Sequence, residues 1–204
     1  MGLCISLAAV ATSHGVSAQT PSPNAKYQIA GLESYTALAD AEAKLKSAGY
    51  TRQVNNAAFS FDQLVANHVA RASGKPVSST RGSIEYQKWI KGGESISVWY
   101  AQAPEGARVK DVLYEATAAV QSFDGVVTAL STRHGRPAYN TRGEAGWCAK
   151  LQSANKCEPN QVRIFASGTS GARIRLMSPN GVDEAVRRQV EAAARAAHGG
   201  SGSF

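Results

Sequence analysis

Apolar residues that recur every three or four positions predict two helices in the first third of the chain. The apolar side of the first, within residues 35–49, consists of Leu38, Ala41, Leu45 and Ala48. The apolar side of the second, within residues 61–73, consists of Phe61, Leu64, Val65, His68 and Val69. Ser60 can cap the second helix, and Gly49 suits the position that follows the end of the first. With residues 50–59 as their connection, the two helices are expected to form a helical hairpin.

Alternation of apolar and polar residues then predicts three strands in succession. They cover residues 83–90, 94–101 and 108–116, and short turns that contain glycine connect them. The middle strand places Ile96, Val98 and Tyr100 on one face. This part of the chain is therefore expected to fold as an antiparallel meander.

The second half of the chain repeats this order of helix and strands. A helix is predicted between Ser122, its cap, and Gly135, and Pro137 forbids its continuation. Three further strands and a last helix are expected at residues 143–150, 161–167, 172–177 and 182–197. The fold class that follows is α+β, with helices packed on antiparallel meander sheets, and the order suggests a duplicated helix-plus-three-strand unit.

The length of the chain suits one domain of ordinary size, which we place at residues 27–198. If the unit is duplicated, residues 27–118 and 119–198 are its two subunits. The glycine-rich end, residues 199–204, is expected to be a disordered tail.

The first 18 residues contain no charged side chain, and the run from Leu3 to Ala11 is mainly apolar. This run is too short to span a bilayer, and the small residues up to Ala18 suit a signal-peptidase site. We interpret residues 1–18 as a secretory signal peptide and residues 19–26 as a flexible lead-in. An apolar strand or helix of the domain is the alternative. The protein is thus expected to be periplasmic or secreted, with no transmembrane segment in the mature chain.

Two cysteines, Cys148 and Cys157, remain once Cys4 is removed with the signal peptide. Two cysteines in an exported protein favour one disulfide, which should stabilise the fold by roughly 2–3 kcal/mol. The spacing is not that of a C-x-x-C redox pair, and His134 alone cannot complete a zinc site. No metal or cofactor is expected, and two free thiols are the alternative to the disulfide.

Basic residues outnumber acidic ones by 22 to 15, which gives a net charge of +7 and favours an acidic partner. The basic residues form no long run and accompany no nucleic-acid motif, so nucleic-acid binding is not expected. Arg163, Arg173 and Arg175 stand on two neighbouring predicted strands and could together hold carboxylates or phosphates. The alternative is a solvated sheet face that needs no ligand.

Three tryptophans, Trp89, Trp99 and Trp147, are candidates for an interface or for the core, since both are rich in aromatic residues. The chain contains no G-x-S-x-G, H-E-x-x-H or phosphate-loop motif, and no catalytic residue is predicted. A histidine base, His68 or His134, would act together with a carboxylate and a nucleophile. The spacing of residues in the sequence does not indicate such a set.

The segment IAGLESYTALADAEAKLKSAGY resembles the start of small envelope modules of the beta-lactamase inhibitor protein type and of the related outer-membrane assembly lipoproteins. The segment ALSTRHGRP, followed by a tryptophan and two cysteines, is similar to a stretch of uncharacterised exported proteobacterial proteins. The resemblance covers mainly residues 28–50 and 122–165. It implies a helix pair packed on one face of an antiparallel sheet, and a role in binding another protein without catalysis. The chain departs from the lipoproteins in having no cysteine at the expected mature N-terminus.

The function predicted from these features is that of an exported, non-catalytic binding module of the cell envelope, whose partner is an envelope protein or an acidic ligand. The alternative is a binder of an anionic small molecule or envelope glycan through the arginine-rich sheet face. A hydrolase of unknown class is the third hypothesis.

Overall fold

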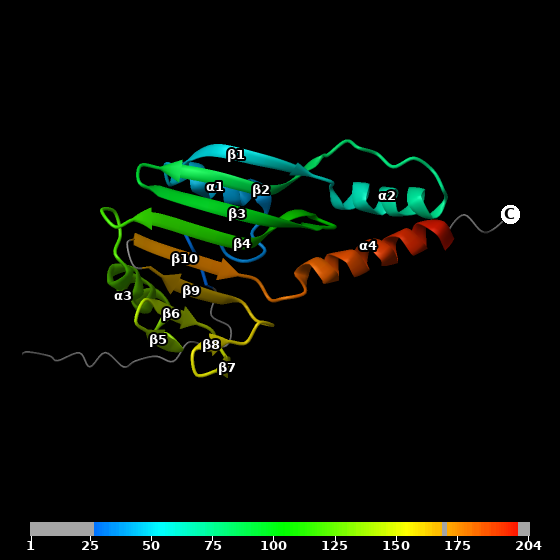
Figure 1. Ribbon diagram of the computed structural model, residues 1–204. Helices are drawn as coiled ribbons and strands as arrows, with labels where there is room; N and C mark the ends of the chain where they lie inside the picture. The colour runs from blue at the N-terminus through cyan, green and yellow to red at the C-terminus, as the bar shows by residue number, and fades with distance from the viewer. Residues whose placement is uncertain (1–26, 169–170, 200–204) are drawn as a thin grey trace, which may run out of the picture.

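The computed structural model describes residues 27–168 and 171–199 (Figure 1). The predicted signal peptide, the lead-in and residues 200–204 lie outside the described residues. The helices are α1 (Leu38–Ser47), α2 (Phe61–Ala72), α3 (Phe123–His134) and α4 (Val182–Gly199). The strands of the first half are β1 (Thr51–Ala58), β2 (Ser83–Lys91), β3 (Glu94–Ala103) and β4 (Gly106–Thr117). Those of the second half are β5 (Tyr139–Thr141), β6 (Glu144–Trp147), β7 (Leu151–Ser153), β8 (Lys156–Cys157), β9 (Arg163–Ser167) and β10 (Gly171–Met177).

Eight of these strands form one antiparallel sheet in the order β1-β2-β3-β4-β10-β9-β6-β5, and β7 and β8 form a separate hairpin. The two halves of the chain meet where β10 pairs with β4, from Gly171 opposite Thr117 to Met177 opposite Asp111. The sheet therefore runs without a break from one half of the chain into the other, which confirms the predicted α+β fold.

The two halves follow the same order, α1-β1-β2-β3-β4 and α3-β5-β6-β9-β10, and each contributes four strands where three were predicted. Helix α2 is inserted between β1 and β2, and the β7-β8 hairpin between β6 and β9. The sequence missed β1 because it is an edge strand with residues 51–57 all exposed, so no apolar alternation marks it. It missed β5 because that strand has only 3 residues.

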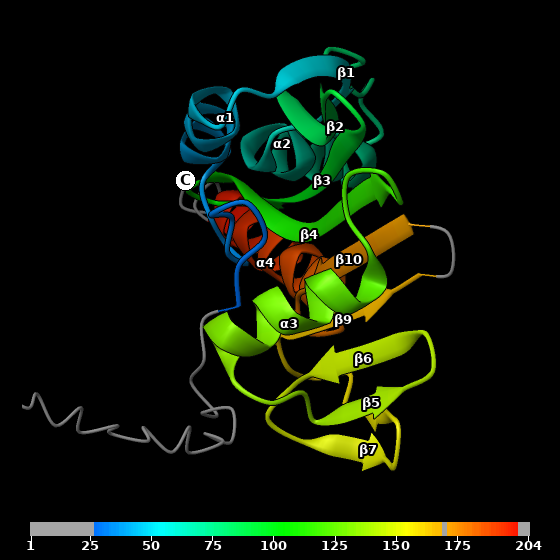
Figure 2. The same ribbon diagram turned by 90° about the vertical axis from the view of Figure 1, so that its left-hand side faces the viewer.

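Helices α1 and α3 lie on the same side of the sheet, which is the rear in Figure 1 and the left in Figure 2. Ala41 and Leu45 of α1 and Val126 and Leu130 of α3 belong to one core cluster with the sheet. The centre of this core is a row of side chains that the strand registers align across six neighbouring strands. All six are completely buried: Gln87, Val98, Val112, Leu176, Ile164 and Trp147.

The predicted helical hairpin of α1 and α2 is wrong, because β1 separates the two helices and α2 packs against α4 instead. These two helices lie side by side beyond one end of the sheet (Figure 1). The predicted caps are confirmed. The Ser60 hydroxyl accepts from the Gln63 N–H at 3.3 Å in a capping box, and the Ser122 hydroxyl accepts from the Gly125 N–H at 3.1 Å. Gly49 follows α1 with a φ of +84°, where a side chain would be strained.

Candidate functional site

The face of the sheet opposite α1 and α3 is turned toward the viewer in Figure 1, and no helix crosses it. We call it the open face. Its membership follows from the registers, because residues paired across strands share a face and neighbours along one strand alternate. On β3, for example, Ile96 and Val98 point into the core and are 0% exposed, whereas Trp99 points to the open face and is half-buried.

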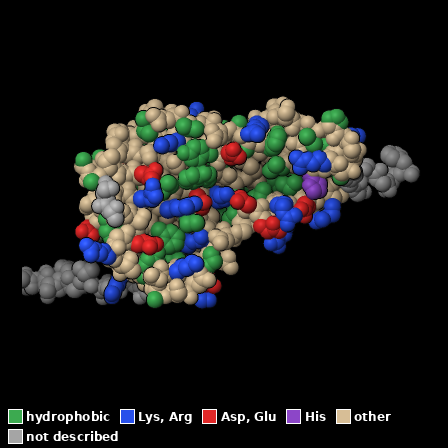
Figure 3. All heavy atoms as spheres, viewed as in Figure 1, with side chains coloured by type: hydrophobic (Ala, Val, Ile, Leu, Met, Phe, Trp, Pro, Cys, Tyr) green, Lys and Arg blue, Asp and Glu red, His purple; other side chains and the backbone are tan. Residues whose placement is uncertain are grey.

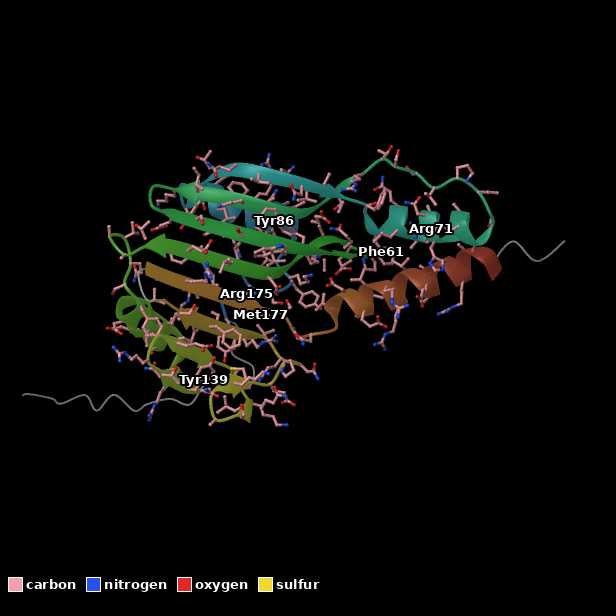
Figure 4. The ribbon with its side chains drawn as sticks, viewed as in Figure 1. Phe61, Arg71, Tyr86, Tyr139, Arg175 and Met177 are labelled. Carbon is pink, nitrogen blue, oxygen red and sulfur yellow. A yellow bond between two sulfur atoms is a disulfide. The ribbon has the colours of Figure 1, made fainter. Side chains whose placement is uncertain are left out.

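Apolar side chains occur on this face on five adjacent strands, β2, β3, β4, β10 and β9, and the charged residues Lys88, Asp111 and Arg175 lie between them. Each is half-buried: Tyr86, Ile90, Trp99, Leu113, Met177 and Phe165. We call these six residues the apolar stripe. Figure 3 shows hydrophobic side chains among charges of both signs on this face, and Figure 4 places Tyr86, Arg175 and Met177 there.

Only one of the three tryptophans reaches the open face. Trp89 is 1% exposed, lies under the Arg52 guanidinium and donates its indole N–H to Gln87 Oε1 at 3.2 Å. Trp147 is 0% exposed and donates its indole N–H to the Gly135 carbonyl at 2.8 Å. Trp99 instead packs beside Tyr86, with ring centroids 5.2 Å apart. The structure therefore assigns Trp89 and Trp147 to the core and leaves Trp99 as the tryptophan that a partner could contact.

The registers place Arg163, Arg173 and Arg175 together on the open face. Two of them meet carboxylates of β4, Arg173 with Glu115 at 2.6 Å and Arg175 with Asp111 at 3.6 Å. An added anion would therefore compete with carboxylates that are already in place.

The third arginine, Arg163, is buried and forms hydrogen bonds within the protein. Its guanidinium donates to three backbone carbonyls and to one side-chain oxygen: those of Pro159, Gln161 and Ser178, and Asn180 Oδ1. Burial lowers the pKa of the Arg163 side chain, which Arg175 lowers further and Asp111 opposes. Arg163 thus acts as a structural tie between β9 and the segment that precedes α4.

Cys148 and Cys157 form the predicted disulfide. Both cysteines are 3% exposed and pack against Tyr139, so the bond fixes the β7-β8 hairpin to the edge of the sheet. The Gln161 side chain supports the same hairpin by accepting from the N–H groups of Ala149 and Lys150 at 3.0 Å. The disulfide is a structural staple, as the sequence predicted.

Neither candidate histidine base is paired with a carboxylate of the described residues. His68 is exposed on α2, and within the described residues neither His68 nor His134 has a hydrogen bond or ion pair to an acidic side chain. The Glu144 carboxylate, which follows His134 by ten residues, accepts from the Tyr139 hydroxyl at 2.9 Å. Residues 27–168 and 171–199 also contain no group of three or more His, Cys, Asp or Glu that could hold a metal ion.

His134 packs against the segment that leads into α1. Its ring meets the edge of Tyr27 at 5.4 Å between centroids, and its Nε2 is buried without a hydrogen-bond partner among the described residues. Burial lowers the pKa of His134 and the charge of Arg133 lowers it further, while the backbone of Gln28 opposes both.

We expect this histidine to make the protein less stable in mild acid. Because its pKa in the folded state lies below the ordinary value of 6.5, the unfolded chain takes up the proton first. The free energy of unfolding should therefore fall as the pH drops from about 7 toward about 5. The midpoint of urea unfolding, recorded at several pH values between about 7 and about 5, measures this loss of stability. His134→Phe should flatten the dependence of the unfolding free energy on pH. An unchanged slope in this variant would contradict the assignment.

An open groove of about 490 Å³ lies at one end of the open face, between the sheet and the start of α4. Residues from four strands and from α4 line it: Asn56, Glu85, Tyr86, Trp99, Lys110 and Asp183. No motif in the sequence marks this groove, since its walls come from segments far apart in the chain.

No family model, curated protein or solved structure matches this chain. The resemblance to modules of the beta-lactamase inhibitor protein type therefore stays a prediction. Within the described residues, no helix has both the length and the apolar composition that a membrane crossing requires.

Proposed function

We propose that this protein is an exported, non-catalytic binding module of the cell envelope, and that it binds a protein partner on its open face. The observation that carries the proposal is the apolar stripe. A solvated face of an antiparallel sheet normally carries polar side chains, whereas here half-buried apolar residues cross five adjacent strands. Contiguous exposed apolar patches with polar surroundings are typical of protein interaction sites.

The charges around the stripe favour a protein over an anionic small molecule. The two charges cancel within each of the ion pairs Arg173–Glu115 and Arg175–Asp111 on the open face. The net charge of +7 is therefore not concentrated there. Balanced polar groups around an apolar centre match the anatomy of a protein interface. The predicted signal peptide supports the cell-envelope setting, and the disulfide fits an oxidising compartment.

The test is capture of a partner from envelope extract by the oxidised protein, compared with variants on and off the open face. Leu113→Asp places a charge in the middle of the apolar stripe and should abolish capture. Leu151→Asp is the matched control, since Leu151 is exposed on the β7-β8 hairpin and lies outside the stripe. Unfolding curves of both variants confirm that they fold.

Capture that survives high salt and depends on Leu113 supports the proposal. Capture that withstands Leu113→Asp but disappears with salt, or in the double variant Arg173→Ser and Arg175→Ser, would overturn it in favour of an anionic ligand.

A further inference from the structure

The groove beside Trp99 has a feature that sets it apart from the rest of the open face. The register between β1 and β2 shifts between Asn56, opposite Tyr86, and Ala57, opposite Ile84, so Glu85 is an extra residue in β2. Such a bulge breaks the alternation of faces. Glu85 and Tyr86 consequently border the same groove although they are neighbours in the chain.

The groove contains one negative charge that no described residue neutralises. Lys110 and Asp183 on its far wall form an ion pair at 2.9 Å and cancel each other. The Glu85 carboxylate is exposed and has no hydrogen bond or ion pair with any described residue. A protein with a net charge of +7 thus presents a locally acidic groove.

An aromatic pair lies next to this carboxylate. The rings of Trp99 and Tyr86 are tilted by 48° to each other, and the Tyr86 hydroxyl is held by a hydrogen bond of 3.1 Å with Ser97 Oγ. The Trp99 side chain is half-buried, which leaves part of it open to the groove. The face of an indole ring attracts a cation, and tryptophan is the strongest of the aromatic residues in this respect.

A partner that covers the open face would strip water from the Glu85 carboxylate. A buried carboxylate without a counter-charge is strongly unfavourable, and a neutral side chain or a neutral sugar cannot supply that charge. A lysine or arginine side chain can pair with Glu85 and at the same time lie against the Trp99 ring. We infer that the Trp99 groove takes a lysine or arginine side chain of the protein partner, an inference that rests on the proposed function of the open face.

Lys88 supplies a matched control of opposite charge. It follows Tyr86 by two residues, so it shares the open face, and it too has no ion pair with any described residue. Replacing Lys88 removes a repulsion for an incoming cation, whereas replacing Glu85 removes an attraction.

The test uses two probes on the full oxidised protein at low salt, the capped tripeptides acetyl-Gly-Arg-Gly-amide and acetyl-Gly-Gln-Gly-amide. Indole N–H signals in the NMR spectrum report the site, because the N–H groups of Trp89 and Trp147 are bonded in the core and serve as internal controls. The arginine peptide should shift the Trp99 signal along a saturating curve with a dissociation constant of the order of 1 mM. The glutamine peptide should not saturate.

The variants decide whether the shift arises from the proposed contact. Glu85→Gln should weaken the binding of the arginine peptide by about three- to fivefold, the size expected of an exposed ion pair. Lys88→Gln should leave the affinity for this peptide equal or increase it. Glu85→Gln should also weaken capture of the protein partner, where the groove is covered. Equal curves for both peptides, or partner capture that does not depend on Glu85, would overturn the inference. Saturation of the Trp99 signal by an N-acetylglucosamine oligomer and not by the arginine peptide would identify a glycan site instead.

Failure of this inference is distinguishable from failure of the proposed function. If capture depends on Leu113 and not on Glu85, the open face binds a protein but the groove takes no cation from it. If Leu113→Asp leaves capture intact, the proposed function itself is wrong.

Discussion

Trp147→Ala is expected to lower the free energy of unfolding by roughly 3–5 kcal/mol, the usual cost of deleting a large aromatic side chain from a core. Trp147 is completely buried at the end of the row of core residues and lies opposite Ile164 of β9. The substitution would leave a cavity there, and it would also leave the Gly135 carbonyl at the end of α3 without its indole donor. The urea midpoint, at an unchanged slope, is the measurement.

Trp99→Ala is the control for this prediction. Because Trp99 is half-buried on the open face and its indole N–H makes no hydrogen bond with a described residue, its loss should cost roughly 1 kcal/mol or less. If Trp99→Ala and Trp147→Ala lowered the free energy of unfolding by similar amounts, the assignment of Trp147 to the core and Trp99 to the open face would be wrong. The comparison therefore tests the assignment of faces, on which the proposed function depends.

Gln87→Leu should be the second strongly destabilising substitution, at roughly 2–5 kcal/mol, although it replaces a polar residue with an apolar one in the core. The Gln87 amide is completely buried and accepts from the Trp89 indole at 3.2 Å and the Tyr100 hydroxyl at 2.9 Å. It also donates to Glu42 Oε1 at 2.6 Å and Asn55 Oδ1 at 3.0 Å. The leucine would leave two buried donors without an acceptor, each at a cost of about 1–3 kcal/mol.

A double-mutant cycle with Tyr100→Phe tests the physical reason for this loss. In the natural chain Tyr100→Phe removes one hydrogen bond and should destabilise by about 1 kcal/mol. In the Gln87→Leu background the same change removes an unpaired hydroxyl, so it should be neutral or stabilising. Additive losses in urea unfolding would contradict the network.

The ends of the helices could be predicted because their signals are local. Ser60 and Ser122 accept hydrogen bonds from N–H groups three residues ahead, and Gly49 adopts the positive φ that a helix end requires. Such contacts join residues that are close together in the chain, so the amino-acid sequence is enough to predict them. The edge strand β1 had no comparable signal, because only its partner β2 makes it a strand.

The candidate site could be predicted only in part. Alternation along β10 correctly placed Arg173 and Arg175 on one face, and the register added Arg163 to it. Nothing in the sequence showed that Glu115 and Asp111 of β4 would neutralise two of these charges. The groove beside Trp99 was not predicted at all, because the bulge at Glu85 and the start of α4 come together only in the folded chain.

The sequence by itself determined the α+β class, the four helices, most of the strands and the disulfide between Cys148 and Cys157. These features arise from periodicity, capping residues and cysteine count, which neighbours along the chain specify. The tertiary structure decided that β4 pairs with β10, that α1 and α3 cover the same face, and that Trp99 alone of the tryptophans lies on the other. An alternating strand has two faces, and only the packing of distant segments settles which one is buried.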